Sequence, residues 1–336
     1  MENESEEKEG DLVEHFAIII DKGQEPMRID KFLMNRIENA SRTKIQAAAG
    51  SGNILVNDKA VKSNYRVKPM DRISIVLPYP VKTDELKAEN IPLNILYEDD
   101  HVIVVNKAAG MVVHPAYGNY SGTLVNALVY HFRDLPSLGG EHPRPGLVHR
   151  IDKDTSGILV LAKDELSMAH LARQFFDHSI ERLYWAMVWG QMPEASGTID
   201  NQLGRSPKNR KIMEVTGPDS EGKRAITHYR VLQAFAHVSL LECKLETGRT
   251  HQIRVHMKHL GHPIFSDETY GGSKVLRGNN SGQYKDFIAK CFVAMPRQAL
   301  HAKTLSFTHP RTGKRMHFES ELPDDFSKLI DLWNNI

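Results

Sequence analysis

A polar turn that leads directly into an unbroken apolar run constrains the fold of this chain more than any other feature. Residues 149–157 read His-Arg-Ile-Asp-Lys-Asp-Thr-Ser-Gly, and the run 158–162 (Ile-Leu-Val-Leu-Ala) follows at once. A short apolar run bounded by turn residues is typical of a buried strand. Asp152 is therefore expected on a loop held by a sheet, where catalytic groups are often found. Asp and Ser also shape turns by bonding their own backbone, so a purely structural role for Asp152 and Asp154 is the alternative.

Length and composition indicate an ordinary globular protein of two domains, one small and one large. The chain has 336 residues, of which 40% are hydrophobic and 25% charged. No apolar run reaches the ~18 residues of a transmembrane helix, and residues 1–10 lack the basic start and apolar core of a signal peptide. The two cysteines, Cys243 and Cys291, exclude a disulfide framework and a CxxC zinc site. This pattern predicts a reducing, cytoplasmic location.

Charge is distributed unevenly along a chain whose net charge is only +1. Residues 1–24 carry eight acids and two bases, which gives −6. Residues 25–78 carry ten bases and five acids (+5), and residues 203–230 carry seven bases and three acids (+4). Two basic segments in a nearly neutral chain indicate a polyanionic partner, although solvated charged faces give the same pattern.

These patterns divide the chain into four parts. Residues 1–24 are expected to be an acidic, disordered tail, and residues 25–78 a compact module of helices and short strands. Residues 79–92 contain prolines and charges and are expected to be a linker. The remainder, residues 93–336, forms the large domain.

Local patterns predict the elements within these domains. Apolar spacing at Ile29, Leu33 and Ile37 indicates one helix, and Ser41 is a plausible N-cap for a second that closes at Gly50. Further helices are predicted at 165–177 and 250–260, and strands at 54–56, 59–61, 72–77, 101–105, 158–162, 183–189, 226–234 and 238–246. Strands outnumber helices in the large domain and do not alternate regularly with them. The predicted fold is α+β with a mixed or antiparallel sheet, preceded by a small domain that mixes helices and strands.

A second motif, residues 247–257, reads Thr-Gly-Arg-Thr-His-Gln-Ile-Arg-Val-His-Met. Thr250 can cap a helix that presents Arg254 on a face of its own. The buried stripe of this helix is predicted to be Ile253, Met257 and Leu260. An arginine beside a carboxylate lowers the pKa of that acid and keeps it ionised. A structural ion pair is the alternative reading of Arg254.

A third motif, residues 182–190, is a predicted strand that contains Tyr184. A tyrosine at such a position is commonly a core residue, but it can also provide a flat surface for a nucleobase. No GxSxG, GxxxxGK[ST] or HExxH motif is present. The spacing of the histidines at 251, 256 and 259 does not suit a metal site, so we expect neither metal nor cofactor.

Together and in this order, the three motifs resemble those of the RluA/RluD-type family of large-subunit ribosomal RNA pseudouridine synthases. The matching residues are 149–152 with 155–157, Tyr184, and 248–256. Supporting segments are 105–107, 110–115, 261–263, 270–272 and 300–302. Residues 27–77 resemble the S4-like RNA-binding domain that often precedes this catalytic domain. The resemblance covers roughly residues 25–322.

The resemblance implies an isomerase that converts uridine in RNA to pseudouridine without a cofactor. Asp152 would be the nucleophile and Arg254 would keep it anionic. Tyr184 would stack on the uracil and help to remove the proton from carbon 5. Large-subunit ribosomal RNA, whose processing includes such modification, is the implied target, and transfer RNA remains open. The chain is expected to act as a monomer.

Six cationic residues are predicted to contact RNA. Arg150 would fill the space left by the target base or bind a phosphate, and a structural ion pair is an equal alternative. The full set of RNA-binding candidates is Lys31, Arg42, Lys44, Lys107, Arg150 and Arg249. The chain departs from the family pattern at Ala108 (usually Pro), Ile151 (usually Leu) and Arg182 (more often Lys), none of which is one of the proposed reacting groups.

Two other classes of function are consistent with parts of the sequence. A non-catalytic RNA-binding protein, such as a ribosome-assembly factor, would explain the basic module. The presence of Asp152, Tyr184 and Arg254 together favours catalysis instead. A glycosidase-like hydrolase would need two carboxylates in the site, and Asp154, the obvious second acid, reads as a turn residue.

Overall fold

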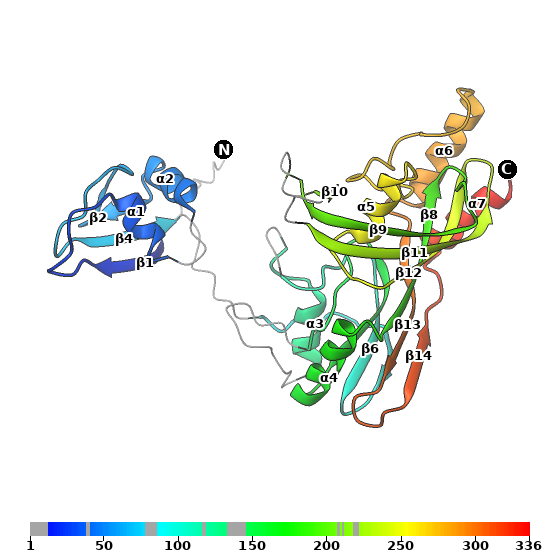
Figure 1. The fold of residues 1–336 in the computed structure, drawn as a ribbon, viewed down its shortest axis with the longest axis horizontal. Helices are drawn as coiled ribbons and strands as arrows, with labels where there is room; N and C mark the ends of the chain where they lie inside the picture. Colours follow the sequence, from blue (N-terminus) through cyan, green and yellow to red (C-terminus); the bar gives the residue numbers. More distant parts are fainter. Residues whose placement is uncertain are drawn as a thin grey trace, which may run out of the picture. The chain divides into compact units, whose positions relative to one another are not determined.

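The computed structural model describes residues 13–37, 41–77, 86–115, 119–132, 146–206, 209, 212–217 and 222–336. The chain divides into two compact units, Met1–Glu85 and Leu86–Ile336 (Figure 1). The first contains the predicted module of helices and strands, and the second contains all three motifs.

The small unit is a four-stranded antiparallel sheet with two helices. Its elements are β1 (Val13–Ile19), α1 (Ile29–Met34), α2 (Arg42–Gly50), β2 (Ile54–Val56), β3 (Lys59–Ala60) and β4 (Arg72–Leu77), with strand order β1-β4-β2-β3. Helix α2 begins as predicted, because the Ser41 hydroxyl accepts a hydrogen bond from the Lys44 amide at 3.3 Å. Asn57 and Asp58 turn the chain between β2 and β3 with φ of 49° and 62°, as a two-residue hairpin requires.

Strand β1 lies where a disordered tail was expected. Residues 13–19 pair with β4, so the tail assignment was wrong for this segment, whereas residues 1–12 lie outside the described residues. Phe16 and Ile18 pack against the core of the small unit, and Ile20 is 1% exposed. This alternation is a strand signal that the dense acids of the segment obscured.

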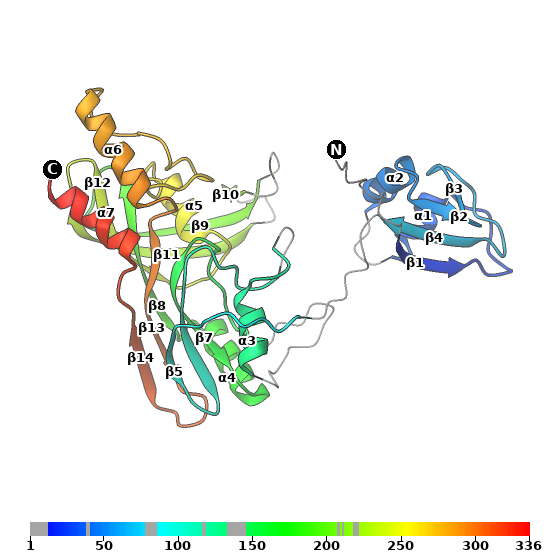
Figure 2. The same ribbon diagram turned by 180° about the vertical axis from the view of Figure 1, so that it is seen from behind.

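The large unit is built on one sheet of ten strands (Figures 1 and 2). Its strands are β5 (Ile95–Glu98), β6 (Val102–Lys107), β7 (Ser156–Ala162), β8 (Glu181–Trp189), β9 (Ser196–Arg205), β10 (Met213–Thr216), β11 (Lys223–Ala234), β12 (Val238–Leu245), β13 (Leu300–Thr308) and β14 (Arg315–Glu319). Their order is β10-β9-β11-β12-β8-β13-β7-β6-β5, and β14 pairs with β13. Among the described strands only β7 and β13 pair in parallel, so the predicted mixed sheet is confirmed.

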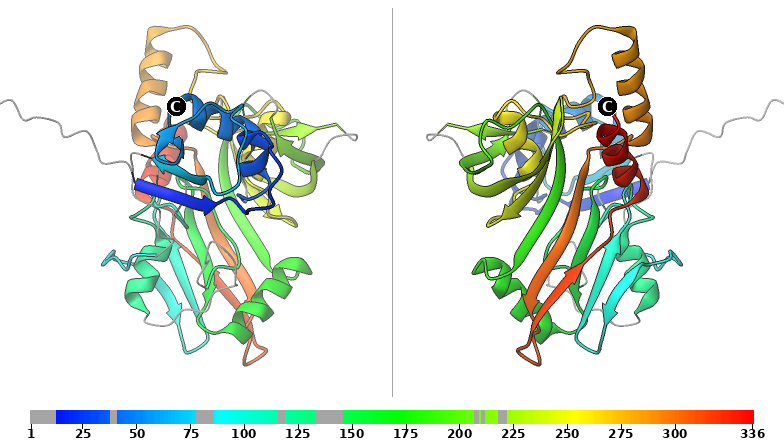
Figure 3. Two further views of the ribbon diagram at one scale, coloured as in Figure 1. Left: turned by 90° about the vertical axis from the view of Figure 1, so that its left-hand side faces the viewer. Right: turned by 90° about the vertical axis from the view of Figure 1, so that its right-hand side faces the viewer.

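Helices pack against the sheet, and they cover both of its faces at β7. They are α3 (Leu124–His131), α4 (Glu165–Phe176), α5 (Gln252–His259), α6 (Gly282–Ala294) and α7 (Asp324–Asn334), of which α6 and α7 lie side by side (Figure 3). Leu159 and Leu161 of β7 belong to the core shared with α3, α6 and α7. Ile158 and Val160 belong to the separate core under α4. Burial on both faces explains why this strand is an unbroken apolar run.

Residues 86–92, part of the predicted linker, belong instead to the large unit. The Glu89 amide donates to the Asn126 carbonyl at 3.0 Å, and the Glu89 carboxylate accepts from the Gly122 amide. Leu86 packs against the large core. Tertiary hydrogen bonds of this kind leave no trace in the local sequence. The rest of the predicted linker, residues 79–85, lies outside the described residues.

Helix α5 is shorter than the predicted helix 250–260, and its start differs. Its N-cap is His251, with φ of 55° and no side-chain cap bond, so Thr250 is not the cap. Ile253 and Met257 are buried as predicted, but Leu260 is 38% exposed. Among the described residues, no helix is long and apolar enough to cross a membrane.

Candidate active site

Asp152 lies in the turn immediately before β7, and buried cations hold this turn in place. The Lys107 ammonium donates to the Lys153 carbonyl at 2.9 Å, and the Arg297 guanidinium donates to the Asp154 carbonyl at 2.8 Å. These bonds fix the backbone of the two residues that follow Asp152 without using the Asp152 carboxylate. The carboxylate therefore stays available for contacts of its own.

Gly157 allows β7 to run close beside β13. It has φ of 118°, and a side chain on it would overlap the backbone oxygen of Ala302. These strands form the parallel pair of the sheet, with Gly157 opposite Ala302. The Ser-Gly end of the first motif is thus required for backbone packing, which sets the distance between the Asp152 turn and β8.

Arg254 joins Asp152 to a second carboxylate that the sequence analysis did not identify. Its Nη1 donates to Asp152 Oδ2 at 3.0 Å, while Nε and Nη2 donate to the two oxygens of Asp267 at 2.7 and 2.9 Å. The exposed fractions of the side chains are 6% for Arg254, 0% for Asp267 and 21% for Asp152. The predicted contact between Arg254 and Asp152 is therefore present, and Asp152 is the accessible member of the cluster.

The charge of Arg254 is stabilised although the residue is buried. Burial alone would lower its pKa, but the hydrogen bonds and charge of Asp267, together with Asp152, raise the pKa above its usual value. Asp267 compensates the buried cation, so the bond from Nη1 can orient Asp152 without being the only neutralising contact of Arg254.

Tyr270 and His251 lie beside Arg254 and Asp152. The Arg254 guanidinium lies 4.9 Å from the Tyr270 ring centre, and the Tyr270 hydroxyl is 2.8 Å from His251 Nδ1. His251 Nε2 lies 4.0 Å from the Oδ1 of Asp152. This is the Asp152 oxygen that Arg254 does not bind.

Tyr184 is buried on β8 at 6% exposure. Burial raises the pKa of its phenol, the Arg182 charge lowers it, and the Asp152 charge raises it. The Asp152 charge therefore acts on the Tyr184 phenol. Of the three predicted catalytic residues, Asp152 and Arg254 are joined by a hydrogen bond, whereas Tyr184 is linked to Asp152 through this electrostatic effect.

The RNA-binding candidates of the large unit separate into two kinds. Lys107 is 2% exposed, and its ammonium donates to three backbone carbonyls. Burial lowers its pKa to about 7. Lys107 is thus part of the support of the Asp152 turn, and its assignment to RNA contact was wrong. Arg150 and Arg249 are exposed, and the Nε of Arg249 donates to the Arg224 carbonyl at 3.0 Å.

The candidates of the small unit lie on or beside its two helices. Lys31 and Lys44 are exposed. Arg42 is 46% exposed at its side chain, and its Nε donates to the fully buried carboxylate of Asp30 at 3.1 Å. Arg28, which the sequence analysis did not select, donates two hydrogen bonds to the same carboxylate.

Two supporting residues, Asp267 and Arg297, were not found from sequence. Asp267 lies 13 residues after Arg254, beyond the end of α5. Its only local signal is the turn in which it accepts from the Tyr270 amide at 3.1 Å. Arg297 lies in the segment between α6 and β13 and pairs with Asp325. Both contacts depend on tertiary structure, which no spacing in the sequence reports.

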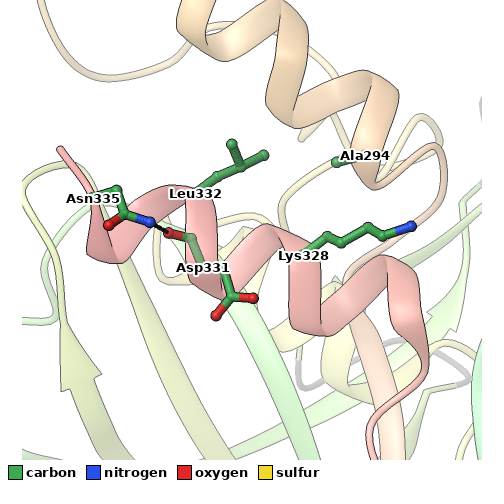
Figure 4. Close-up of a pocket in the computed structure, with 5 residues that line it drawn as sticks. All are labelled: Ala294, Lys328, Asp331, Leu332 and Asn335. Carbon is green, nitrogen blue, oxygen red and sulfur yellow. Dashed lines mark hydrogen bonds between the residues drawn. The ribbon is translucent and has the colours of Figure 1, made fainter.

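A separate hollow lies between α6 and α7 (Figure 4). It is lined by Ala294, Lys328, Asp331, Leu332 and Asn335. None of the elements that carry the Asp152 cluster contributes to it. In the described part of the chain, no group of three or more His, Cys, Asp or Glu side chains is placed to hold a metal ion.

Comparisons with known proteins show the family of this chain. The family model for RNA pseudouridylate synthases matches residues 101–259, and the S4 domain model matches residues 27–73. A relative from Chlorobaculum parvum, an uncharacterized RNA pseudouridine synthase, is 48% identical over 93% of this chain and 95% of its own length. This chain belongs to the RNA pseudouridine synthase family.

Other members of the family support the same assignment. A protein of Zymomonas mobilis named ribosomal large subunit pseudouridine synthase D is 44% identical, over 91% of this chain and 93% of that protein. The solved structure of human RNA pseudouridylate synthase domain containing 1 is 27% identical, with a TM-score of 0.53. The match covers 73% of this chain and 89% of the human chain. The family membership confirms the predicted α+β fold with an S4 domain ahead of the catalytic domain.

Proposed function

We propose that this enzyme isomerises uridines of large-subunit ribosomal RNA, with Asp152 as nucleophile. The observation that carries the proposal is the bond from the buried Arg254 to Asp152, which leaves the other carboxylate oxygen accessible. Relatives named for the large ribosomal subunit are 39–44% identical over 90% or more of this chain.

The chemistry is an internal rearrangement of one nucleotide. The bond from ribose carbon 1 to uracil N1 breaks, the base turns, and a bond from ribose carbon 1 to uracil carbon 5 forms. The proton on carbon 5 is lost and N1 gains one, so atoms and electrons balance with no cofactor. We assign the attack on the nucleotide to Oδ1 of Asp152, because Oδ2 is occupied by the Arg254 bond.

Tyr184 is proposed to contact the uracil. Because burial raises the pKa of its phenol, the hydroxyl is protonated in the free enzyme. It therefore meets the base first as a stacking and hydrogen-bonding surface. Acceptance of the carbon 5 proton requires the phenol proton to leave, which the charge of Arg182 favours and that of Asp152 opposes.

RNA recognition is assigned to exposed cations outside the reacting cluster. A uridine in folded RNA must leave its stack to reach Asp152, at a cost of a few kcal/mol. Phosphate contacts offset such a cost. We propose that Lys31, Arg42 and Lys44 of the S4 domain, with Arg150 and Arg249, provide them.

The basic segment 203–230 is a further candidate, although part of its charge is used internally. Arg224 pairs with Asp200 and Arg230 with Glu242.

The monomeric state and the cytoplasmic location of this chain stay predictions. The location was predicted from its few cysteines, and Cys243 and Cys291 are both buried and unpaired.

The test is an assay of the purified chain on two RNA pools, large-subunit ribosomal RNA and transfer RNA, each prepared without modifications. We expect pseudouridine to form at one or a few ribosomal positions and at none in transfer RNA. Conversion of transfer RNA alone would replace the proposed substrate. Tight binding without conversion would instead favour a ribosome-assembly role.

A further inference from the structure

His251 lies in the active site without a part in the chemistry described so far. Its backbone has φ of 55°, a left-handed conformation that few residues other than glycine adopt, although histidine, asparagine and aspartate adopt it more often than the rest. Strained residues of this kind concentrate at functional sites because the surroundings must hold them in place. The conformation places His251 at the N-terminal boundary of α5 with 22% of its side chain exposed.

The hydrogen bonds around Tyr270 assign the proton on the His251 ring. The Met213 amide donates to the Tyr270 hydroxyl at 3.0 Å, so this oxygen already acts as an acceptor. The other polar partner of that hydroxyl among the described residues is His251 Nδ1, at 2.8 Å. We therefore assign the hydroxyl proton to the bond with Nδ1, an arrangement in which the phenol both accepts one hydrogen bond and donates one.

A neutral ring that accepts at Nδ1 carries its own proton on Nε2. Burial lowers the pKa of His251, which favours this neutral form at pH 7. The donor Nε2 lies 4.0 Å from Oδ1 of Asp152. This separation is too long for a hydrogen bond.

The 4.0 Å gap between these two atoms is too short for an oxygen to lie on the line between them, but an oxygen beside that line can lie within hydrogen-bond distance of both. An oxygen about 2.8 Å from each atom would accept from Nε2 and donate to the carboxylate. A uracil carbonyl can accept but cannot donate, so it satisfies only one side. The 2′-hydroxyl of ribose does both, and it lies next to ribose carbon 1, the carbon whose bond to uracil N1 breaks in the proposed reaction.

We propose that His251 and Asp152 together bind the 2′-hydroxyl of the target nucleotide, so that His251 is a residue that selects ribose over deoxyribose. The inference rests on the proposed role of Asp152. The 2′-hydroxyl is the group by which a protein distinguishes RNA from DNA at a single nucleotide. The contact would also hold the sugar beside the nucleophile.

The test compares two substrate RNAs that differ only by a 2′-deoxyuridine at the modified position. His251→Asn is the informative variant, because asparagine tolerates positive φ. Its short side chain can still accept from Tyr270 but cannot reach the gap beside Asp152. His259→Asn is the matched control, an exposed histidine at the other end of the same helix.

We expect the wild type and His259→Asn to prefer the ribose substrate by about tenfold or more in kcat/KM, the value of one good hydrogen bond. For His251→Asn the preference should fall below about threefold, through a loss on the ribose substrate. An unchanged preference in His251→Asn overturns the inference, and so does a wild type without preference. Inactivity of both the wild type and His251→Asn on the deoxyuridine substrate also counts against the inference, since the choice of ribose over deoxyribose then does not depend on His251.

Failure of the proposed function would show differently in this experiment. Wild type and His259→Asn would then form no pseudouridine even in the ribose substrate.

Discussion

The two units each contain a cluster of aspartate and arginine, and the clusters are arranged in opposite ways. In the small unit the carboxylate is buried: Asp30 is 0% exposed, while its partners Arg28 and Arg42 are 40% and 46% exposed. In the large unit the cation is buried: Arg254 is 6% exposed, and its partner Asp152 is 21% exposed.

Burial thus decides which charge each cluster presents to solvent. A buried acid that orients two half-exposed arginines offers cations to a polyanion, at fixed positions. A buried arginine, neutralised from behind by Asp267, offers a single oriented carboxylate. The same pair of residue types is therefore proposed to serve phosphate binding in one unit and nucleophilic chemistry in the other.

The comparison predicts its largest effect at the exposed acid of the catalytic cluster. Asp152→Asn keeps an oxygen for Arg254 but removes the nucleophile, so pseudouridine formation should fall at least about a thousandfold. The free energy of unfolding should change by less than about 1 kcal/mol, because no core packing is lost. Single-turnover assays and chemical denaturation measure the two effects. Activity within tenfold of the wild type would remove Asp152 as nucleophile.

Asp267→Asn tests whether the buried acid stabilises Arg254. Removal of one partner of a buried ion pair costs about 3–5 kcal/mol, and we expect the lower end, since Asp152 still neutralises Arg254. Asp152 would then serve as the sole counter-charge, and activity should fall about tenfold to a hundredfold. Denaturant unfolding followed by tryptophan fluorescence reports on the large unit, which contains Trp185, Trp189 and Trp333. An unchanged midpoint would show that Asp267 is dispensable.

Asp30→Ala tests the inverse arrangement in the small unit. We expect a local loss of about 1–3 kcal/mol, since the half-exposed arginines can regain water. Hydrogen exchange of the peptides that contain α1 and α2 measures this loss, while exchange in the large unit should not change. RNA affinity should fall although no cation is removed, because Arg28 and Arg42 lose their fixed geometry.

The same acid predicts a pH dependence. The hydrogen bond from Arg28 holds the pKa of Asp30 well below its ordinary value. A carboxyl whose pKa is lowered by folding stabilises the fold above its unfolded pKa, and the stability is lost as pH falls. The protection of the α1 and α2 amides against hydrogen exchange should therefore fall below about pH 4 in the wild type and not in Asp30→Ala. Equal acid sensitivity of both would contradict the role of Asp30.

The smallest effects are expected for single cations of the S4 domain. Lys44→Ala should weaken RNA binding severalfold and reduce the slope of log affinity against log salt by about one. The rate of conversion in the bound complex should stay unchanged, because Lys44 belongs to the S4 domain and the proposed reacting groups belong to the large unit. Lys107→Met, which removes a buried lysine, is the matched contrast. It should disturb the Asp152 turn and lower the rate of conversion, but it should leave the slope of log affinity against log salt unchanged.

The fold was largely predictable because its strongest signals are local. The apolar run of β7, the alternation of β4 and the Ser41 cap each identify an element without tertiary information. Strand β1 was missed because its acids suggested a tail, although Phe16, Ile18 and Ile20 alternate toward the core.

The candidate site was predictable only for residues that carry a sequence motif. Asp152, Tyr184 and Arg254 lie in three separate motifs, and their convergence follows from family resemblance rather than from spacing. Asp267 and the true role of Lys107 depend on contacts across the fold, to Arg254 and to the Asp152 turn. A lysine in sequence does not show whether its ammonium faces a phosphate or three backbone carbonyls.

The measurement that tests the central claim most directly is a map of pseudouridine in ribosomal and transfer RNA from cells that lack this protein. The cells are complemented with the wild type or with Asp152→Asn, at equal protein levels. The account predicts that one or more large-subunit sites disappear and that only the wild type restores them. Restoration of those sites by Asp152→Asn, or persistence of every large-subunit site in the uncomplemented cells, would contradict it.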